Sequence, residues 1–143
     1  MLIGEFTHTI DDKGRLSVPA KFRPRLKSGI VVTRGLDHCL FVYPQKTWAE
    51  FADKLANLPI SGSKARAFTR LMLAGASEDK PDSQGRIMVP EYLRKYAGLK
   101  KHVVILGLVN RLEVWEEAAW HTYRRKTEAA SEEIAESMSE LGL

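Results

Sequence analysis

Cysteine is almost absent from this chain of 143 residues, which contains only Cys39. One cysteine cannot form a disulfide within the chain, and such scarcity fits a reducing compartment. Long apolar runs are absent too, because stretches such as residues 103–108 are far shorter than the about 20 residues that span a bilayer. The N-terminus lacks the basic start and apolar stretch of a signal peptide. We therefore expect a cytoplasmic protein that does not associate with a membrane.

Motifs of catalytic and metal sites are also missing. The four histidines do not show the paired spacing of a zinc site, and no phosphate-binding Gly-x-x-x-x-Gly-Lys-Ser/Thr string or Gly-x-Ser-x-Gly nucleophile motif occurs. Asp11 and Asp12 could be read as an acid/base pair, but the equivalent of Asp12 in a second copy of this motif is Ser83. The sequence predicts neither an enzyme nor a bound metal or other cofactor.

Negative charge is scarce in most of the chain. Residues 1–115 carry 19 Lys/Arg and 11 Asp/Glu, whereas residues 116–143 carry 3 Lys/Arg and 7 Asp/Glu. The body is therefore basic and the tail acidic. A basic body favours a polyanionic partner, because neutralising phosphates releases counterions, although charge alone does not identify nucleic acid.

What the chain does contain is an internal repeat. Residues 11–19 read DDKGRLSVP and residues 82–90 read DSQGRIMVP, a constant offset of 71. The match extends from Gly4 and Gly75 to Arg23 and Arg94, and resumes at an offset of 72 as far as Trp48 and Trp120. Each copy alone is too short to bury a good core, so we expect two similar halves that pack together, related by a pseudo-two-fold axis.

Each copy is predicted to be rich in β-hairpins and to end in a helix. A strand at 3–10 leads into a loop and the strand 16–18, with Gly14 and Gly85 in the left-handed conformation that such loops require. Pro19 or Pro90 ends this strand and can occupy the first position of a short helix, which carries Phe22 and Leu26 in one copy and Leu93 and Ala97 in the other. Two further strands follow, at 30–33 and 39–43 in the first copy and at 103–106 and 112–115 in the second. The fold class is α+β, mainly β, and neither a helical bundle nor a parallel βαβ fold.

Helical periodicity completes the organisation. Trp48, Phe51, Leu55 and Leu58 share a helix face, a second helix at 64–73 links the copies, and a third starts near Glu116. We divide the chain into a first module with its helix (1–58), a linking helix (59–74), a second module (75–127) and an acidic helical tail (128–143). The tail is either a helix that docks on a partner or a frayed end.

The repeated arginines have two interpretations. Arg15 and Arg86 could pair with Asp11 and Asp82 and stiffen their loops, which hairpin chemistry alone favours. Alternatively, their planar donor forks could bind phosphate oxygens or a guanine edge. Other aromatic and basic groups are better explained by the core or by solvated helix faces; these are Tyr43, Trp48, Trp115 and Trp120, the basic set Lys64, Arg66 and Arg70, and the set Arg124, Arg125 and Lys126.

The doubled Asp-x-x-x-Arg loops, the flanking Gly4 and Gly75, and the strand-ending Pro19 and Pro90 resemble the MraZ family over residues 1 to about 125. So do the segments RLMLAGA (70–76) and EVWEEAAW (113–120). The resemblance implies tandem swapped-hairpin β-barrel modules of the SpoVT/AbrB superfamily, in a protein that assembles into homo-oligomeric rings and associates with the nucleoid. It also implies a transcriptional regulator, expected to be a repressor, of the division and cell-wall gene cluster that includes its own gene, bound to short direct repeats in double-stranded DNA.

Carried over by position, the implied DNA-binding residues are Asp11 and Arg15 in the first module and Asp82 and Arg86 in the second. Lys13 corresponds to the uncharged Gln84, and residues 21–27 are more basic than their counterpart 92–98. We therefore expect the first module to be the main DNA reader, with Lys13, Lys21 and Arg23 contributing. The competing classes are a structural ring scaffold, an AbrB-like antitoxin, which usually has one module, and an enzyme.

Overall fold

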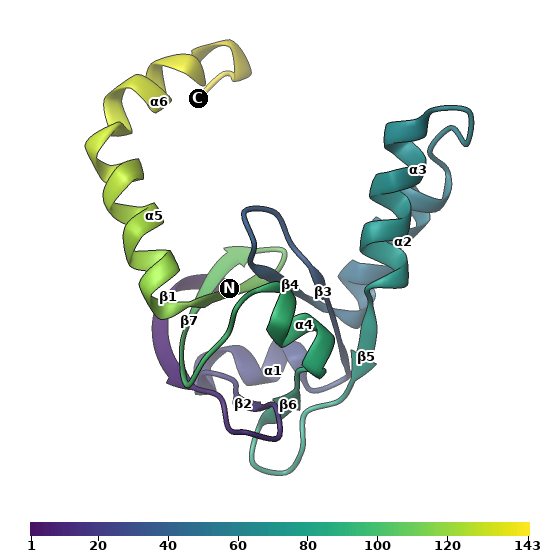
Figure 1. Cartoon of the computed structure of the whole chain (residues 1–143), viewed down its shortest axis with the longest axis vertical. Helices are drawn as coiled ribbons and strands as arrows, with labels where there is room; N and C mark the ends of the chain where they lie inside the picture. Colours follow the sequence, from purple (N-terminus) through teal and green to yellow (C-terminus); the bar gives the residue numbers. More distant parts are fainter.

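Strands of the two repeats are interleaved in the computed structural model, which describes residues 1–143. The main sheet has six antiparallel strands in the order β1 (Leu2–Thr9), β7 (His102–Val109), β8 (Leu112–Glu116), β4 (Leu40–Pro44), β3 (Ile30–Arg34) and β5 (Ser77–Asp79) (Figure 1). Strand β1 of the first repeat pairs with β7 of the second, and the equivalent β5 pairs with β3. The α+β class and the predominance of antiparallel strands are confirmed.

A second, two-stranded sheet joins β2 (Arg15–Ser17) to β6 (Arg86–Met88), with Leu16 opposite Ile87. The two short strands are equivalent positions of the repeat, so the pairing has the predicted two-fold character. The predicted hairpin loop between these strands is present, because Asp11 N donates to Arg15 O and Gly14 N to Asp11 O. Beyond it, β1 and β2 share only the bridge between Ile10 and Leu16, whereas β3–β4 and β7–β8 form the full hairpins within each repeat. Strand β2 pairs across the repeats because that arrangement buries Leu16 and Ile87 together in the core.

One apolar core lies between the sheets and the short helices η1 (Ala20–Phe22), α1 (Arg23–Leu26) and α4 (Glu91–Tyr96). Phe22 and Leu26 from the first repeat and Leu93 and Ala97 from the second are buried there, as predicted. Pro19 and Pro90 stand one residue earlier than expected, as the residues that precede η1 and α4. Since both repeats supply this core, neither half has one of its own.

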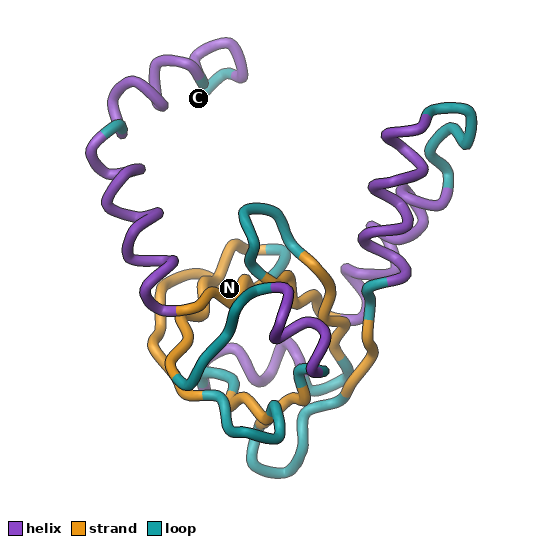
Figure 2. Tube along the Cα trace, viewed as in Figure 1, coloured by secondary structure: helices purple, strands orange, loops and turns teal.

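The remaining helices form two arms that leave the body on the same side and diverge (Figures 1 and 2). The first arm comprises α2 (Gln45–Ala56) and α3 (Ser63–Thr69), with the π-helical turn η2 (Arg70–Ala74) at its base. The second comprises α5 (Glu117–Ala129), α6 (Ser131–Ser137) and η3 (Ser139–Leu141). The helices predicted after each repeat and between the repeats are confirmed. None of the helices combines the length and apolarity needed to cross a bilayer.

The arms pack on a second apolar cluster at their bases. Tyr43 and Trp115 are buried there, and Trp48 and Trp120 pack against them, so the interpretation of these aromatic residues as core is confirmed. The β2–β6 ribbon and the loops 11–14 and 82–85 lie at the opposite end of the molecule from the arm tips (Figure 1). The loops and the helical arms therefore lie at opposite ends of the body.

Candidate nucleic-acid interface

The first loop is organised by the carboxylate of Asp11. Its Oδ1 accepts hydrogen bonds from the backbone N–H of Lys13 at 3.0 Å and of Arg15 at 2.8 Å, and its Oδ2 accepts one from Arg15 Nε at 2.7 Å. The backbone closes the turn, because Gly14 N donates to Asp11 O and Asp11 N donates to Arg15 O. Aspartate is suited to this position since its short side chain can accept bonds from amides two residues on.

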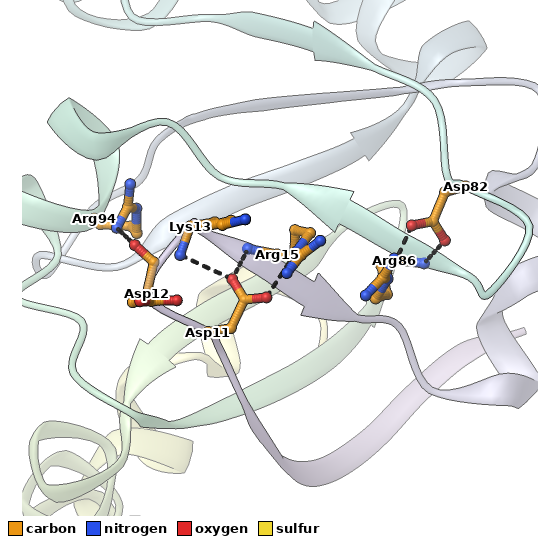
Figure 3. Close-up of polar contacts among 7 residues, drawn as sticks. All are labelled: Asp11, Asp12, Lys13, Arg15, Asp82, Arg86 and Arg94. Atoms are coloured by element: carbon orange, nitrogen blue, oxygen red, sulfur yellow. Dashed lines mark hydrogen bonds and ion pairs between the residues drawn. The ribbon is translucent and has the colours of Figure 1, made fainter.

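The second loop repeats this geometry around Asp82 (Figure 3). The backbone N–H groups of Gln84 and Arg86 each donate to Asp82 Oδ1 at 2.9 Å, and Arg86 Nε donates to Oδ2 at 2.9 Å. The pairing of each arginine with the aspartate of its own loop, which hairpin chemistry favoured, is therefore confirmed. This pairing uses only the Nε–H of each guanidinium, so the terminal amino groups can still bind phosphate oxygens or a guanine edge.

Both carboxylates are held in the ionised state. Hydrogen bonds from the backbone N–H of Arg15 and from its guanidinium lower the pKa of Asp11 below its usual value, and the weaker opposing effect of desolvation does not cancel them. Arg86 lowers the pKa of Asp82 in the same way. At neutral pH each loop therefore keeps a full negative charge that fixes the orientation of its arginine.

The outer face of the β2–β6 ribbon carries the two arginines. Leu16 and Ile87 point into the core, so the alternation of a strand turns Arg15, Ser17, Arg86 and Met88 outward. The Arg15 and Arg86 side chains are 37% and 29% exposed, and their terminal amino groups make no hydrogen bond within the chain. The structure thus brings together, on one exposed surface, two arginine forks that the sequence placed 71 residues apart.

Two further arginines hold the loops across the repeats. Arg94 Nε donates to Val89 O at 3.0 Å, and its Nη1 lies 3.4 Å from Asp12 O. Its equivalent, Arg23, donates from Nε to Val18 O at 3.0 Å and lies against Gly85 of the other loop. Arg94 lies against Gly14 in the same manner. The sequence predicts Arg23 as a binding residue and not Arg94, although the repeat alignment of the two arginines is a sufficient signal.

The other predicted site residues are placed differently. Lys13 is exposed at the tip of the first loop. Lys21 belongs to η1, and its amino group lies over the rings of Phe6 and Phe22, at 5.6 and 5.7 Å from their centroids. It is therefore beside the core and not in a loop. The predicted set is thus divided between the loops, which hold Asp11, Lys13, Arg15, Asp82 and Arg86, and the helical segment that holds Lys21 and Arg23.

A basic hollow beside the first loop was not foreseen. It has a volume of about 400 Å³ and is lined by Asp11, Asp12 and the cations Arg94, Lys100 and Lys101. The backbone brings this segment close, because Ile10 N donates to Lys101 O at 2.9 Å. Lys100 and Lys101 follow the second repeat's short helix and are distant from the loop in sequence, so only the interleaving of the repeats places them there.

The fold and the loops define an internally duplicated α+β protein with a doubled, arginine-bearing loop. The family model described as "MraZ protein, putative antitoxin-like" matches it twice, over residues 1–71 and 72–141. The chain belongs to the MraZ family.

Curated relatives support this assignment over the full length. A protein of Carboxydothermus hydrogenoformans is 50% identical over 138 residues, 96% of each chain, and one of Halothermothrix orenii is 50% identical over 143 residues, 100% of each chain. Both are named "Transcriptional regulator MraZ". These names describe a regulator of transcription and not an enzyme, in agreement with the expectation from the sequence.

Proposed function

We propose that this chain regulates transcription by binding double-stranded DNA with the outer face of the β2–β6 ribbon. The observation that carries the proposal is the pair Arg15 and Arg86, each oriented by its own aspartate and each with free terminal amino groups. A two-stranded ribbon fits the major groove, where arginine can donate two hydrogen bonds to guanine O6 and N7. Lys13, Arg94, Lys100 and Lys101 supply positive charge beside it for the phosphates.

The first module is the main reader in this proposal. Its loop carries Lys13 where the second carries Gln84, and the following segment 21–27 is rich in lysine and arginine. Asp11 and Asp82 act by positioning the arginines, while Lys21 and Arg23 add charge at the side of the ribbon. The modules 1–58 and 75–127 are proposed to form a swapped-hairpin barrel of the AbrB-like type together, since their strands are interleaved around one core. The linking helix 59–74 and the tail 128–143 lie outside that barrel.

Several copies are needed for tight binding. One ribbon offers few contacts, so we propose a ring of identical chains in the cytoplasm, associated with the nucleoid, that presents ribbons to short direct repeats. When one contact is made, the next becomes intramolecular and gains from a high effective concentration. Occupied repeats upstream of the division and cell-wall gene cluster, which includes the protein's own gene, would repress it by blocking the promoter.

The test compares the wild-type protein with Arg15→Ala on DNA from upstream of its own gene, across a salt series. We expect Arg15→Ala to weaken specific binding at least tenfold, because a bidentate arginine contact contributes about 1–3 kcal/mol at each site. The matched control is Arg125→Ala, which removes the same charge from an exposed position on α5. Arg86→Ala, measured in parallel, shows which of the two modules contributes more to DNA affinity.

The outcomes separate the interpretations. Loss of specific binding in Arg15→Ala, with an unchanged oligomer by light scattering and unchanged binding in Arg125→Ala, supports the ribbon as the DNA reader. Equal binding by the wild type and Arg15→Ala would contradict it and make the doubled loop structural. If the wild type has no preference for its upstream DNA over a random sequence, the regulator proposal itself fails.

A further inference from the structure

The two helical arms carry opposite charge at their tips. In the first arm, residues 63–70 include Lys64, Arg66 and Arg70 and no acidic residue. In the second arm, residues 127–143 include five glutamates and no lysine or arginine. Neither feature has a role in the ribbon at the other end of the molecule, so each is left without a function by the DNA-binding proposal.

The tip of the first arm contains an apolar hollow with a basic rim. It has a volume of about 210 Å³ and lies between α2 and α3, where Leu55, Leu58, Pro59, Ile60 and Ala65 form much of its wall. Arg66 and Arg70 line the same hollow. Leu58 and Ile60 are 40% and 79% exposed, which leaves apolar surface open to solvent at the end of a helical hairpin.

The second arm carries the complementary surface. Ile134 on α6, Met138 directly after α6 and Leu141 on the 3-10 turn η3 are spaced i, i+4 and i+7, the spacing of apolar anchors in helical segments that enter grooves, and Ile134 and Leu141 are exposed. Beside them, where α5 bends into α6, a polar hollow of about 520 Å³ is lined by Glu128, Glu132, Glu133 and Glu136. An apolar stripe next to an acidic hollow matches an apolar hollow with an arginine rim.

These surfaces are kept apart within one chain. The base of α5 is fixed by Trp120 and Tyr123, whose rings lie 5.2 and 4.9 Å from that of Trp115, and by the ion pair of 2.7 Å between Arg124 and Glu5. The base of the first arm is fixed by the hydrogen bond of 2.7 Å from Thr33 Oγ1 to Met72 O. With both bases anchored, the arms diverge (Figures 1 and 2), and the complementary tips belong to different copies.

We propose that the acidic arm of one copy, through α6 and η3, docks on the tip of the α2–α3 arm of a second copy. The contact joins two different surfaces, so it is heterologous and generates a closed ring or an open chain of subunits. This inference rests on the homo-oligomer in the proposed function and names the surfaces that build it. It leaves the β2–β6 ribbons free at the other end of each subunit.

Two charge-reversed variants test the contact. Variant A is Arg66→Glu with Arg70→Glu, and variant B is Glu133→Lys with Glu136→Lys. Each alone places like charges on both sides of every contact, so we expect light scattering to show a fall from the wild-type mass towards the 16.1 kDa of one chain. An equimolar mixture of A and B should recover the large assembly, because A and B alternate with opposite charges at each contact.

The matched control is Lys46→Glu with Lys54→Glu, which makes the same charge change on α2 outside the apolar hollow and should leave the assembly intact. Because Arg66 Nη1 also donates to Ile60 O, a second measurement avoids changing it. Chains carrying Ile60→Cys are mixed with chains carrying Ile134→Cys under oxidation, and a disulfide between the two is expected. The native Cys39 is buried and does not interfere.

Three results would overturn the inference. One is a wild-type assembly that survives in both A and B. Another is failure of the mixture to reassemble together with absence of the disulfide. The third is an assembly that forms from a single chain carrying all four changes but not from the mixture of A and B. That result would place the two arms of one chain in contact with each other. If A and B are monomeric but still bind one operator repeat, the DNA-binding proposal stands whatever the fate of the ring.

Discussion

At the scale of single residues, the same loop arrangement occurs in both repeats. An aspartate accepts three hydrogen bonds from its loop, a glycine turns the chain, and an arginine is held outward. The glycines are required for two reasons. Gly14 and Gly85 have φ of +86° and +75°, and each also leaves room for an arginine from the other repeat. A residue change in the loop therefore affects both repeats.

Substituting Gly14 tests this double requirement. A Cβ at Gly14 would lie 2.4 Å from the backbone oxygen of Val89, whereas one at Gly98, with φ of +60°, would meet nothing within 4 Å. We expect Gly98→Ala to lower the free energy of unfolding by about 1 kcal/mol, from backbone strain alone, and Gly14→Ala by about 3 kcal/mol. Urea unfolding measures both, and equal losses would show that the loops do not pack closely.

At the scale of elements, the β2–β6 ribbon is stabilised by the side chains of its inner face, which are buried in the core. Leu16 and Ile87 are 1% and 2% exposed, and they anchor two strands of only three residues each to the shared core. Strands this short gain little from their ladder, so burial is what keeps them paired. Periodicity in the sequence identified which face of each strand is apolar. It could not identify the partner strand, because alternation is the same whichever strand lies alongside.

A pair of truncations on the ribbon separates burial from exposure. Leu16→Ala should lower the free energy of unfolding by about 3 kcal/mol, the range for a leucine removed from a packed core. Met88→Ala, on the outer face at 41% exposure, should change it by about 0.5 kcal/mol or less. Denaturant titration followed by far-UV circular dichroism gives both values. A large effect of Met88→Ala would mean that the outer face is covered.

At the scale of the whole molecule, the two repeats form one folding unit. The main core takes Leu2, Phe22 and Leu40 from the first repeat and Ile87, Leu93 and Val103 from the second. Four of the strand pairings cross between repeats. An isolated half would expose both its core side and its unpaired strand edges, so the halves stabilise each other.

This predicts a single cooperative unfolding transition. Single-tryptophan variants that keep Trp48, from the first repeat, or Trp115, from the second, report on the two halves separately. We expect their fluorescence to change at the same urea concentration, and to coincide with the loss of far-UV circular dichroism. Transitions at separate concentrations would show that the repeats unfold independently.

The sequence by itself determined the duplication, the α+β class, the loop glycines and the doubled Asp-x-x-x-Arg motif. These depend on local chemistry: turn residues, strand alternation and helical periodicity act over a few positions and repeat visibly along the chain. The tertiary structure decided which strands pair, that Arg23 and Arg94 each lie against the loop of the other repeat, that Lys100 and Lys101 flank the first loop, and that the arms diverge. Those features depend on a shared core that forms only when distant segments bury their apolar faces together, and such long-range packing has no local signature.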